Sequence, residues 1–160
     1  MKDKKDLKII ENTFNKEFGL YKRLLDLSRK QSKAIELSEL EMLEKLLKEK
    51  EEIITEIDIL EESLEFYKER IISRLDLNPK SWLKELLETR PVPTSFKRTA
   101  FNLIEVMESL YEIDQKNQQL IKKNRLKLME QRKELKRGIH VNKSYKQRPR
   151  IYSSFIDKKG

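Results

Sequence analysis

Residues 38–75 decide the fold of this 160-residue chain: SELEMLEKLLKEKEEIITEIDILEESLEFYKERIISRL. Apolar residues recur here at steps of three and four, which is the spacing of one face of an α-helix. That face contains Leu40, Leu43, Leu47, Lys50, Ile54, Ile57, Leu60, Leu64, Tyr67, Ile71 and Leu75. The stretch predicts a coiled-coil-like rod of roughly 55 Å, since each helical residue adds about 1.5 Å.

Two more amphipathic helices are predicted beside this rod, over residues 4–35 and from residue 94 or 95 to Gly138. The first has an apolar stripe that contains Leu7, Ile10, Phe14, Phe18, Tyr21, Leu25, Ser28 and Ile35. The stripe of the last helix becomes polar in its second half and contains Ala100, Leu103, Met107, Leu110, Asp114, Asn117, Ile121, Asn124, Leu128, Gln131 and Leu135.

The boundaries of these helices also have sequence signals. Ser38 and Glu41 form a capping-box pattern, and Leu37 with Met42 could form a hydrophobic staple, so we expect the middle helix to begin at Ser38. Farther along, a short helix is predicted between Asn78-Pro79 and Arg90-Pro91-Val92-Pro93, because proline favours helix starts and prevents helix continuation.

These elements predict an all-α fold: an elongated antiparallel helical bundle or coiled coil of three long helices and one short helix. Short connections place consecutive long helices antiparallel, so the first two form a hairpin against which the last one packs. We expect residues 1–138 to form the helical domain. Residues 139–160 lose the helical periodicity and are expected to be a flexible basic tail.

The formal net charge of +8 is distributed unevenly. Residues 136–160 carry eight Lys and Arg against one acid, whereas residues 1–135 carry 28 bases and 27 acids. Within that near-neutral body, residues 36–69 hold 13 acids and 4 bases, and residues 116–135 hold 7 bases and 2 acids. We therefore expect an acidic helix to lie along a basic one, with exposed pairs worth only about 0–1 kcal/mol each.

The composition argues against most kinds of chemistry. The chain has no Cys, one His (His140) and three scattered Gly, which excludes a disulfide framework, a thiolate zinc site and a Gly-rich phosphate loop. Paired acids such as Glu51-Glu52 lack the concave setting that catalysis needs in a thin bundle. We expect no catalytic residue, cofactor or metal site, and a cytoplasmic protein without membrane insertion, because no apolar stretch approaches membrane length.

Two regions are candidate interaction sites. The last helix carries apolar residues on more than one face, which suits a helical partner or a homodimer. The tail combines basic residues with Tyr145, Tyr152 and Phe155, which fits single-stranded nucleic acid, docking of an aromatic into a partner, or a solvated tail. Lys50 and Asn117, which are polar residues in apolar stripes, are expected to fix register or partner choice.

Three segments resemble the FlgN family of flagellar type III export chaperones. Residues 24–60 contain an acidic, leucine-rich stretch followed by Lys50-Glu51 and Ile53-Ile54. Residues 110–121, LYEIDQKNQQLI, resemble the segment of the family's last helix that has two polar positions, here Asp114 and Asn117. The third similarity is the basic tail, which contains Tyr145 and closes with Phe-Ile-Asp-Lys-Lys.

The resemblance implies a non-enzymatic cytoplasmic chaperone domain over residues 1–138. Its cargo would be terminal helical segments of hook-filament junction (hook-associated) proteins, which it would keep from assembling prematurely. It would deliver them to the cytoplasmic domain of the export gate and to the export ATPase complex. The implied partner-binding residues are Asn117, Leu120, Ile121, Leu128, Leu135, Tyr145 and Tyr152.

Other hypotheses remain open beside this one. The basic tail favours a helical nucleic-acid-binding protein, although no specific nucleic acid is expected as a partner, and steep salt dependence of binding would identify nonspecific charge. The repeating pattern of Leu, Glu and Lys is also typical of a structural coiled coil. Another flagellar export chaperone of similar helical build fits the same layout.

Overall fold

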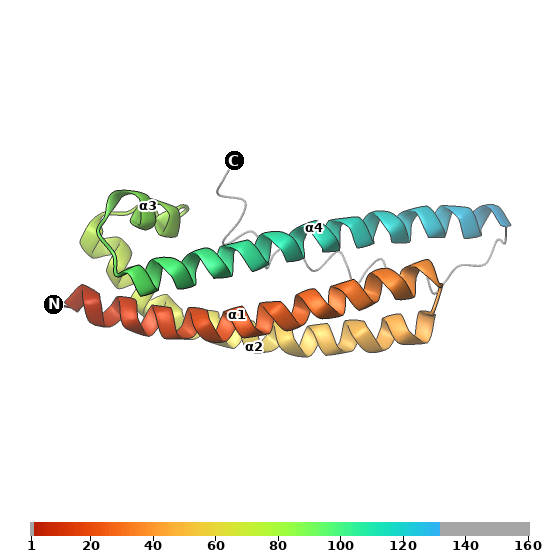
Figure 1. Cartoon of the computed structure of the whole chain (residues 1–160), viewed down its shortest axis with the longest axis horizontal. Coiled ribbons are helices and arrows are strands. Elements are labelled where there is room, and N and C mark those ends of the chain that lie inside the picture. The colour runs from red at the N-terminus through yellow and green to blue at the C-terminus, as the bar shows by residue number, and fades with distance from the viewer. Residues whose placement is uncertain (1, 132–160) are drawn as a thin grey trace.

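The computed structural model describes residues 2–131, which form four helices and contain no strand. They are α1 (Lys2–Glu36), α2 (Leu40–Leu75), α3 (Trp82–Thr89) and α4 (Thr94–Gln131) (Figure 1). The predicted all-α fold of three long helices and one short helix is confirmed. The predicted end of the last helix at Gly138 and the predicted tail over residues 139–160 lie outside the described residues.

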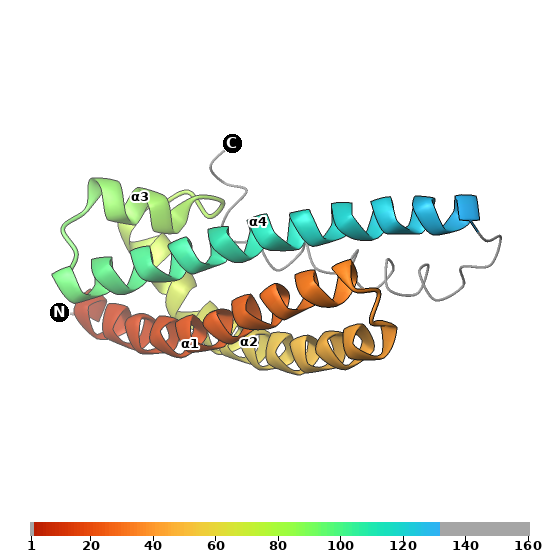
Figure 2. The same cartoon turned by 45° about the vertical axis from the view of Figure 1, so that its right-hand side comes forward.

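α1 is the central helix of the bundle and packs against both α2 and α4. α2 returns antiparallel to α1, whereas α4 starts at the same end as α1 and runs parallel to it. The direction of α4 follows from its contacts, because Ser95 bonds to Glu11 near one end of α1 and Asn124 bonds to Ile35 near the other. α4 continues for about two turns beyond Asn124, so its last residues project past the α1–α2 turn (Figure 2).

A single apolar core runs along the bundle. At one end the core is covered by α3, where Trp82, Leu83, Leu86 and Leu87 are all buried. There the ring of Phe14 lies 6.5 Å from the ring of Trp82 and 6.0 Å from that of Phe96. Aromatic side chains bury large apolar areas, so α3 closes this end of the core although it has only eight residues.

The turn between α1 and α2 differs from the capping box that the sequence predicts. Glu39 is the N-cap of α2 and makes no side-chain capping bond, and Leu37 and Met42 are both exposed, so they form no staple. Ser38 instead adopts a left-handed backbone with φ of 54°. The amides of Ser38 and Glu39 bond to carbonyls of the last turn of α1, in the pattern of a Schellman motif. Ser38 therefore ends α1 rather than beginning α2.

The predicted pairing of acidic and basic helices is also wrong for the described residues. No ion pair joins an acid of residues 36–69 to a base of residues 116–131. The ion pair that does join α2 to α4 has the opposite sense, because the base is Lys50 on α2 and the acid is Asp114 on α4. Net charge along a helix did not reveal which charged residues face the neighbouring helix.

None of the helices in residues 2–131 combines the length and the apolar character that crossing a lipid bilayer requires.

Candidate functional site

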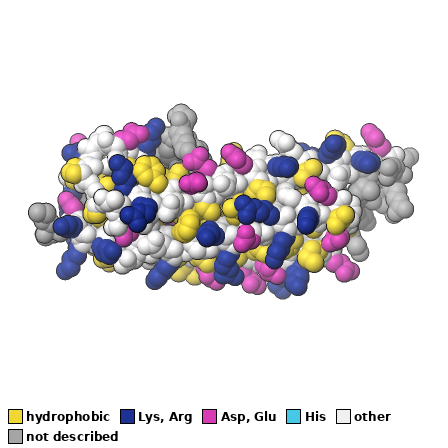
Figure 3. Space-filling model, in the orientation of Figure 1, with side chains coloured by type: hydrophobic (Ala, Val, Ile, Leu, Met, Phe, Trp, Pro, Cys, Tyr) yellow, Lys and Arg dark blue, Asp and Glu magenta, His cyan; other side chains and the backbone are white. Residues whose placement is uncertain are grey.

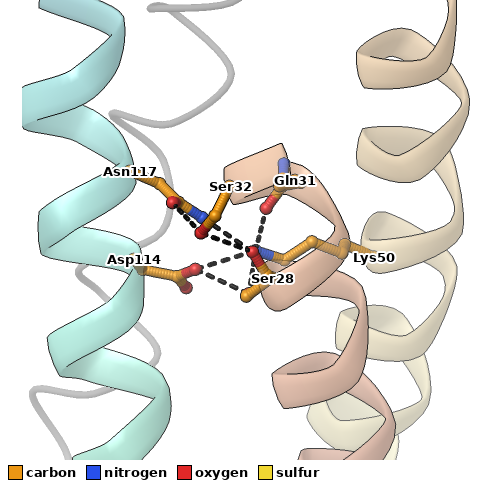
Figure 4. A network of polar contacts seen from close by, with 6 residues as sticks. All are labelled: Ser28, Gln31, Ser32, Lys50, Asp114 and Asn117. Carbon is orange, nitrogen blue, oxygen red and sulfur yellow. Dashed lines mark hydrogen bonds and ion pairs between the residues drawn. The ribbon is translucent and has the colours of Figure 1, made fainter. Parts of the chain in front are cut away.

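A buried polar network joins the three long helices in the part of the bundle nearer the α1–α2 turn (Figure 4). Lys50 of α2, only 1% exposed, donates from Nζ to Ser28 Oγ at 2.7 Å and to Gln31 Oε1 at 2.8 Å, both on α1. The same ammonium lies 3.0 Å from Oδ1 of Asp114 on α4, and Ser28 Oγ donates to that oxygen at 2.7 Å. An ammonium has three hydrogens to donate, and here each has an acceptor.

Asn117, one turn beyond Asp114 on α4, extends the network toward the α1–α2 turn. Its Nδ2 donates to the carbonyl of Ser28 at 2.9 Å, and its Oδ1 accepts a bond from Ser32 Oγ at 2.5 Å. Two turns later, Asn124 Nδ2 donates to the carbonyl of Ile35 at 2.9 Å. Three polar residues of the α4 stripe, Asp114, Asn117 and Asn124, are therefore paired with α1. These contacts fix the register between two parallel helices, as expected for Asn117.

The predicted partner-binding residues have different positions in the structure. Asn117 is fully buried, and Ile121 is buried at 6% exposure, so both face the inside of the bundle. Leu120 is partly buried and packs against the core from its edge. Leu128 lies in α4, and nothing is described of its side chain. The remaining predicted residues, Leu135, Tyr145 and Tyr152, lie outside the described residues.

Sequence reasoning identified Lys50, Asp114 and Asn117 as polar residues in apolar stripes, but did not identify their partners on α1. Ser28 carried a usable signal, because it is a polar residue in the apolar stripe of the first helix. Gln31 and Ser32 lie three and four residues later, one turn along the same face. A search for polar residues on the facing sides of neighbouring helices would have found all of them.

A second group of polar side chains is buried without partners. Both carboxyl oxygens of Glu17, the hydroxyl of Tyr21 and Oε1 of Glu61 are buried and accept or donate no hydrogen bond within the described residues. Burial, and then the charge of Glu61, raises the pKa of Glu17 from 4.5 to about 8. Burial, and then the charge of Asp58, raises the pKa of Glu61 to about 7, although the charge of Lys68 acts in the opposite direction. Glu17, Tyr21 and Glu61 have no buried basic residue among them, whereas the first network is centred on Lys50.

The surface offers two apolar regions to a partner. The first is a groove of about 320 Å³ between α1 and α4. It is lined by Phe18, Lys22, Leu25, Asp26, Arg29, Asn102, Glu105, Val106 and Ser109. Figure 3 shows hydrophobic side chains between charged ones along the middle of the molecule. Lys22 lies over the ring of Phe18 at 5.4 Å, so side chains of the groove already cover part of its apolar floor.

The second apolar region lies at the end of the bundle where α4 projects. We call it the distal apolar surface and define it by Leu37, Met42, Leu126 and Met129, which are 67%, 43%, 63% and 51% exposed. The four residues lie toward the same end of the molecule, although Leu126 is about 200° around α4 from Asn124, which bonds to α1, so Leu126 lies on the side of α4 turned away from α1. Leu126 and Met129 lie past Asn124, the last α4 residue with a hydrogen bond to α1 in the described residues.

The described residues contain no group of three or more His, Cys, Asp or Glu side chains that could hold a metal ion.

Lys50→Met tests the first network. We expect the free energy of unfolding to fall by about 3–5 kcal/mol, because the change leaves Asp114 as a buried charge without its counter-ion. Asp114→Leu added to Lys50→Met should recover part of that loss, since it removes the stranded charge. Urea unfolding followed by circular dichroism measures both effects, and purely additive losses in the double variant would contradict the network.

The acidic group predicts that stability falls at alkaline pH. The folded state holds the protons of Glu17 and Glu61 more tightly than the unfolded chain does. Their contribution is therefore complete below about pH 4.5 and is lost as pH rises through 7 and 8. Glu17→Gln should remove much of this decline and raise the free energy of unfolding at pH 9 by roughly a few kcal/mol relative to the parent chain.

Glu36→Gln is the matched control for this experiment, because Glu36 is exposed on the same helix. Urea unfolding at pH 5, 7 and 9 should show the parent decline in Glu36→Gln and a flatter profile in Glu17→Gln. Equal profiles in the two variants would contradict the assignment to Glu17.

Comparisons with known proteins agree with the resemblance drawn from the sequence. The model of one family, described as FlgN protein, matches residues 1–148, which is most of the chain. Searches of curated proteins and of solved structures gave no match. The match includes all four helices and both polar positions of the α4 stripe. The chain therefore belongs to the FlgN family, whose members are non-enzymatic flagellar export chaperones for hook-associated proteins.

Proposed function

We propose that this chain works in the cytoplasm and binds the terminal helical segments of hook-filament junction proteins, keeps them from assembling too early and delivers them to the type III export gate. Family membership supports the class of cargo. The observation that supports a binding site is the distal apolar surface, because its side chains have no cover within the described bundle.

The distal apolar surface fits one face of an amphipathic helix. A helix presents apolar residues at steps of three and four, and Leu126 and Met129 are three residues apart on α4. Leu37 and Met42, at the α1–α2 turn, are further exposed apolar side chains at this end of the bundle. We place Leu120, Leu128 and Leu135 in the same cargo site as proposed extensions along α4. The roles of Asn117 and Ile121 are indirect, because they hold the course of α4 from inside the bundle.

Protection of the cargo follows from the same contact. A junction-protein segment that can bury its apolar face only against another copy would bury it against α4 instead. The chaperone then competes with assembly through mass action, and no chemical step or cofactor is needed. Release requires only that a second partner, such as the export gate, changes the balance of binding free energies.

Delivery is assigned to residues after the described bundle. We propose that an aromatic of the tail, Tyr145 or Tyr152, docks on the cytoplasmic domain of the gate, and that the export ATPase complex is a further partner. A short segment with an aromatic anchor can bind a groove with modest affinity and release easily.

The cargo site is tested by Leu126→Asp combined with Met129→Asp. We expect affinity for a terminal segment of a junction protein to fall at least about tenfold, because charges are placed in an apolar contact. Helicity and unfolding should stay close to the parent values, since both side chains are exposed. Isothermal titration calorimetry with purified cargo segments measures the loss.

Ile59→Asp is the matched control for the cargo experiment. Ile59 is 61% exposed, like Leu126, but lies on α2 away from the distal apolar surface. It should leave cargo affinity unchanged. If Leu126→Asp and Met129→Asp instead convert a homodimer into a monomer and leave cargo binding intact, the surface is a dimer interface and the proposed cargo site is wrong.

Truncation after Gly138 tests the role of the tail in delivery. The shortened chain should keep its helicity and its cargo affinity but bind the cytoplasmic domain of the gate more weakly. Pull-down of that domain with cargo-loaded full-length and truncated chains compares the two. Equal gate binding by both chains would show that delivery does not use residues 139–160.

A further inference from the structure

The exposed side of α2 carries a row of acidic residues, in which the exposed Lys48 lies between Glu44 and Glu51. Its residues follow one another at steps of seven, four and three, which places them along one face of the helix. We define the acidic stripe as Glu44, Glu51, Asp58, Glu62, Glu65 and Glu69, all of which are exposed. Within the described residues, Glu65 is the stripe residue that has an ion pair, with Lys68 at 3.6 Å.

Few basic side chains form ion pairs with the acids of this stripe in the described residues. The bases of α4 that the sequence predicted as its partners make no ion pair with it in the described residues. Burial is the main cause that raises the pKa of the adjacent Glu61, and the charges of Asp58 and Glu65 add to the rise while that of Lys68 opposes it. Glu17 of α1, whose pKa burial and then the charge of Glu61 raise, is buried with both carboxyl oxygens unpaired within the described residues. A basic segment lying on α2 would relieve this repulsion.

The chain itself contains such a segment. Residues 136–160 carry eight Lys and Arg against one acid. They follow α4, whose last residues project at the end of the bundle where α2 begins (Figures 1 and 2). Residues 132–160 can span up to about 95 Å when extended, whereas α2 is about 54 Å long, so the chain is long enough to return along the whole stripe.

We propose that residues 139–160 dock in the same molecule on the acidic stripe of α2. The contact is electrostatic, with Lys143, Lys146, Arg148 and Arg150 set against the stripe. Tethering favours the intramolecular contact, because a short linker gives an effective concentration in the millimolar range. Each ion pair between the tail and the stripe is weak, but together they form a contact that high salt would screen and weaken.

This contact has a consequence for delivery, which rests on the proposed function. Tyr145 and Tyr152 lie among the basic residues of the tail, so a tail docked on α2 would hold both away from the export gate. Binding of the tail to the gate and docking of the tail on α2 would then compete. Acidic residues on the gate would bind the basic tail in place of the acidic stripe.

The absence of cysteine makes the docking directly measurable. Thr55→Cys places one dye on the exposed side of α2, and Ser153→Cys places the other in the tail. We expect high energy transfer between the dyes at low salt in the purified full-length chain without cargo or gate. Transfer should be lost at about 0.5 M salt, where the screening length is only a few ångströms.

Two charge variants of the labelled chain test the specific contact. Glu51→Lys, Asp58→Lys and Glu62→Lys together should reduce transfer at low salt to the value seen at high salt. Lys143→Gln, Lys146→Gln, Arg148→Gln and Arg150→Gln together should do the same from the other side. The matched control, Glu88→Lys, Glu105→Lys and Glu112→Lys, makes the same change in net charge as the stripe variant at exposed acids off α2 and should keep transfer high.

Three results would overturn the docking. They are low transfer at low salt in the parent chain, an equal loss in the stripe variant and the off-stripe control, and transfer that rises with protein concentration. The last of these would mean that the tail reaches a second copy. Because neither cargo nor gate is present, each result leaves the proposed chaperone function to be judged by its own experiments.

Discussion

The buried ammonium of Lys50 is the constraint on which the arrangement of the long helices depends. A charge removed from water must meet its full set of partners, and Lys50 finds them on α1 and α4 at once. Sliding any of the three helices by one turn would separate the ammonium from Ser28, Gln31 or Asp114. The apolar core supplies most of the burial, and this network adds directional contacts that favour one register.

The interior thus contains two polar groups with opposite consequences. The Lys50 ammonium has its acceptors, although Nε2 of Gln31 beside it is buried without a hydrogen-bond partner in the described residues. Glu17, the hydroxyl of Tyr21 and Oε1 of Glu61 are also buried without partners there, and burial raises the pKa of all three groups. The contacts of α2 with its neighbours therefore differ along its length, because Lys50 is paired whereas Oε1 of Glu61 is not. The α2 segment that contains Glu61 is also the one that carries the acidic stripe, which links the buried repulsion to the surface proposed to receive the tail.

The register between α1 and α4 also determines which α4 residues are exposed at the end of the bundle. Because Asn117 and Asn124 hold α4 parallel to α1, the last turns of α4 extend past the α1–α2 turn and expose Leu126 and Met129. The proposed cargo site, the start of the proposed tail contact and the exit of the tail all lie at this end. α3 closes the opposite end with Trp82 and its neighbours. The molecule therefore has one closed end and one end arranged for binding.

The sequence by itself determined the number of helices, most of their limits and the stripes that face the core, because helix formation and amphipathic spacing depend on residues a few positions apart. It also singled out Lys50, Asp114 and Asn117 as exceptions in those stripes. Only the tertiary structure decided that Ser28, Gln31 and Ser32 are their partners, that Ser38 ends α1 and that the acids of α2 and the bases of α4 do not pair. These outcomes depend on the rotation and register of whole helices, which arise from packing between residues distant in the chain.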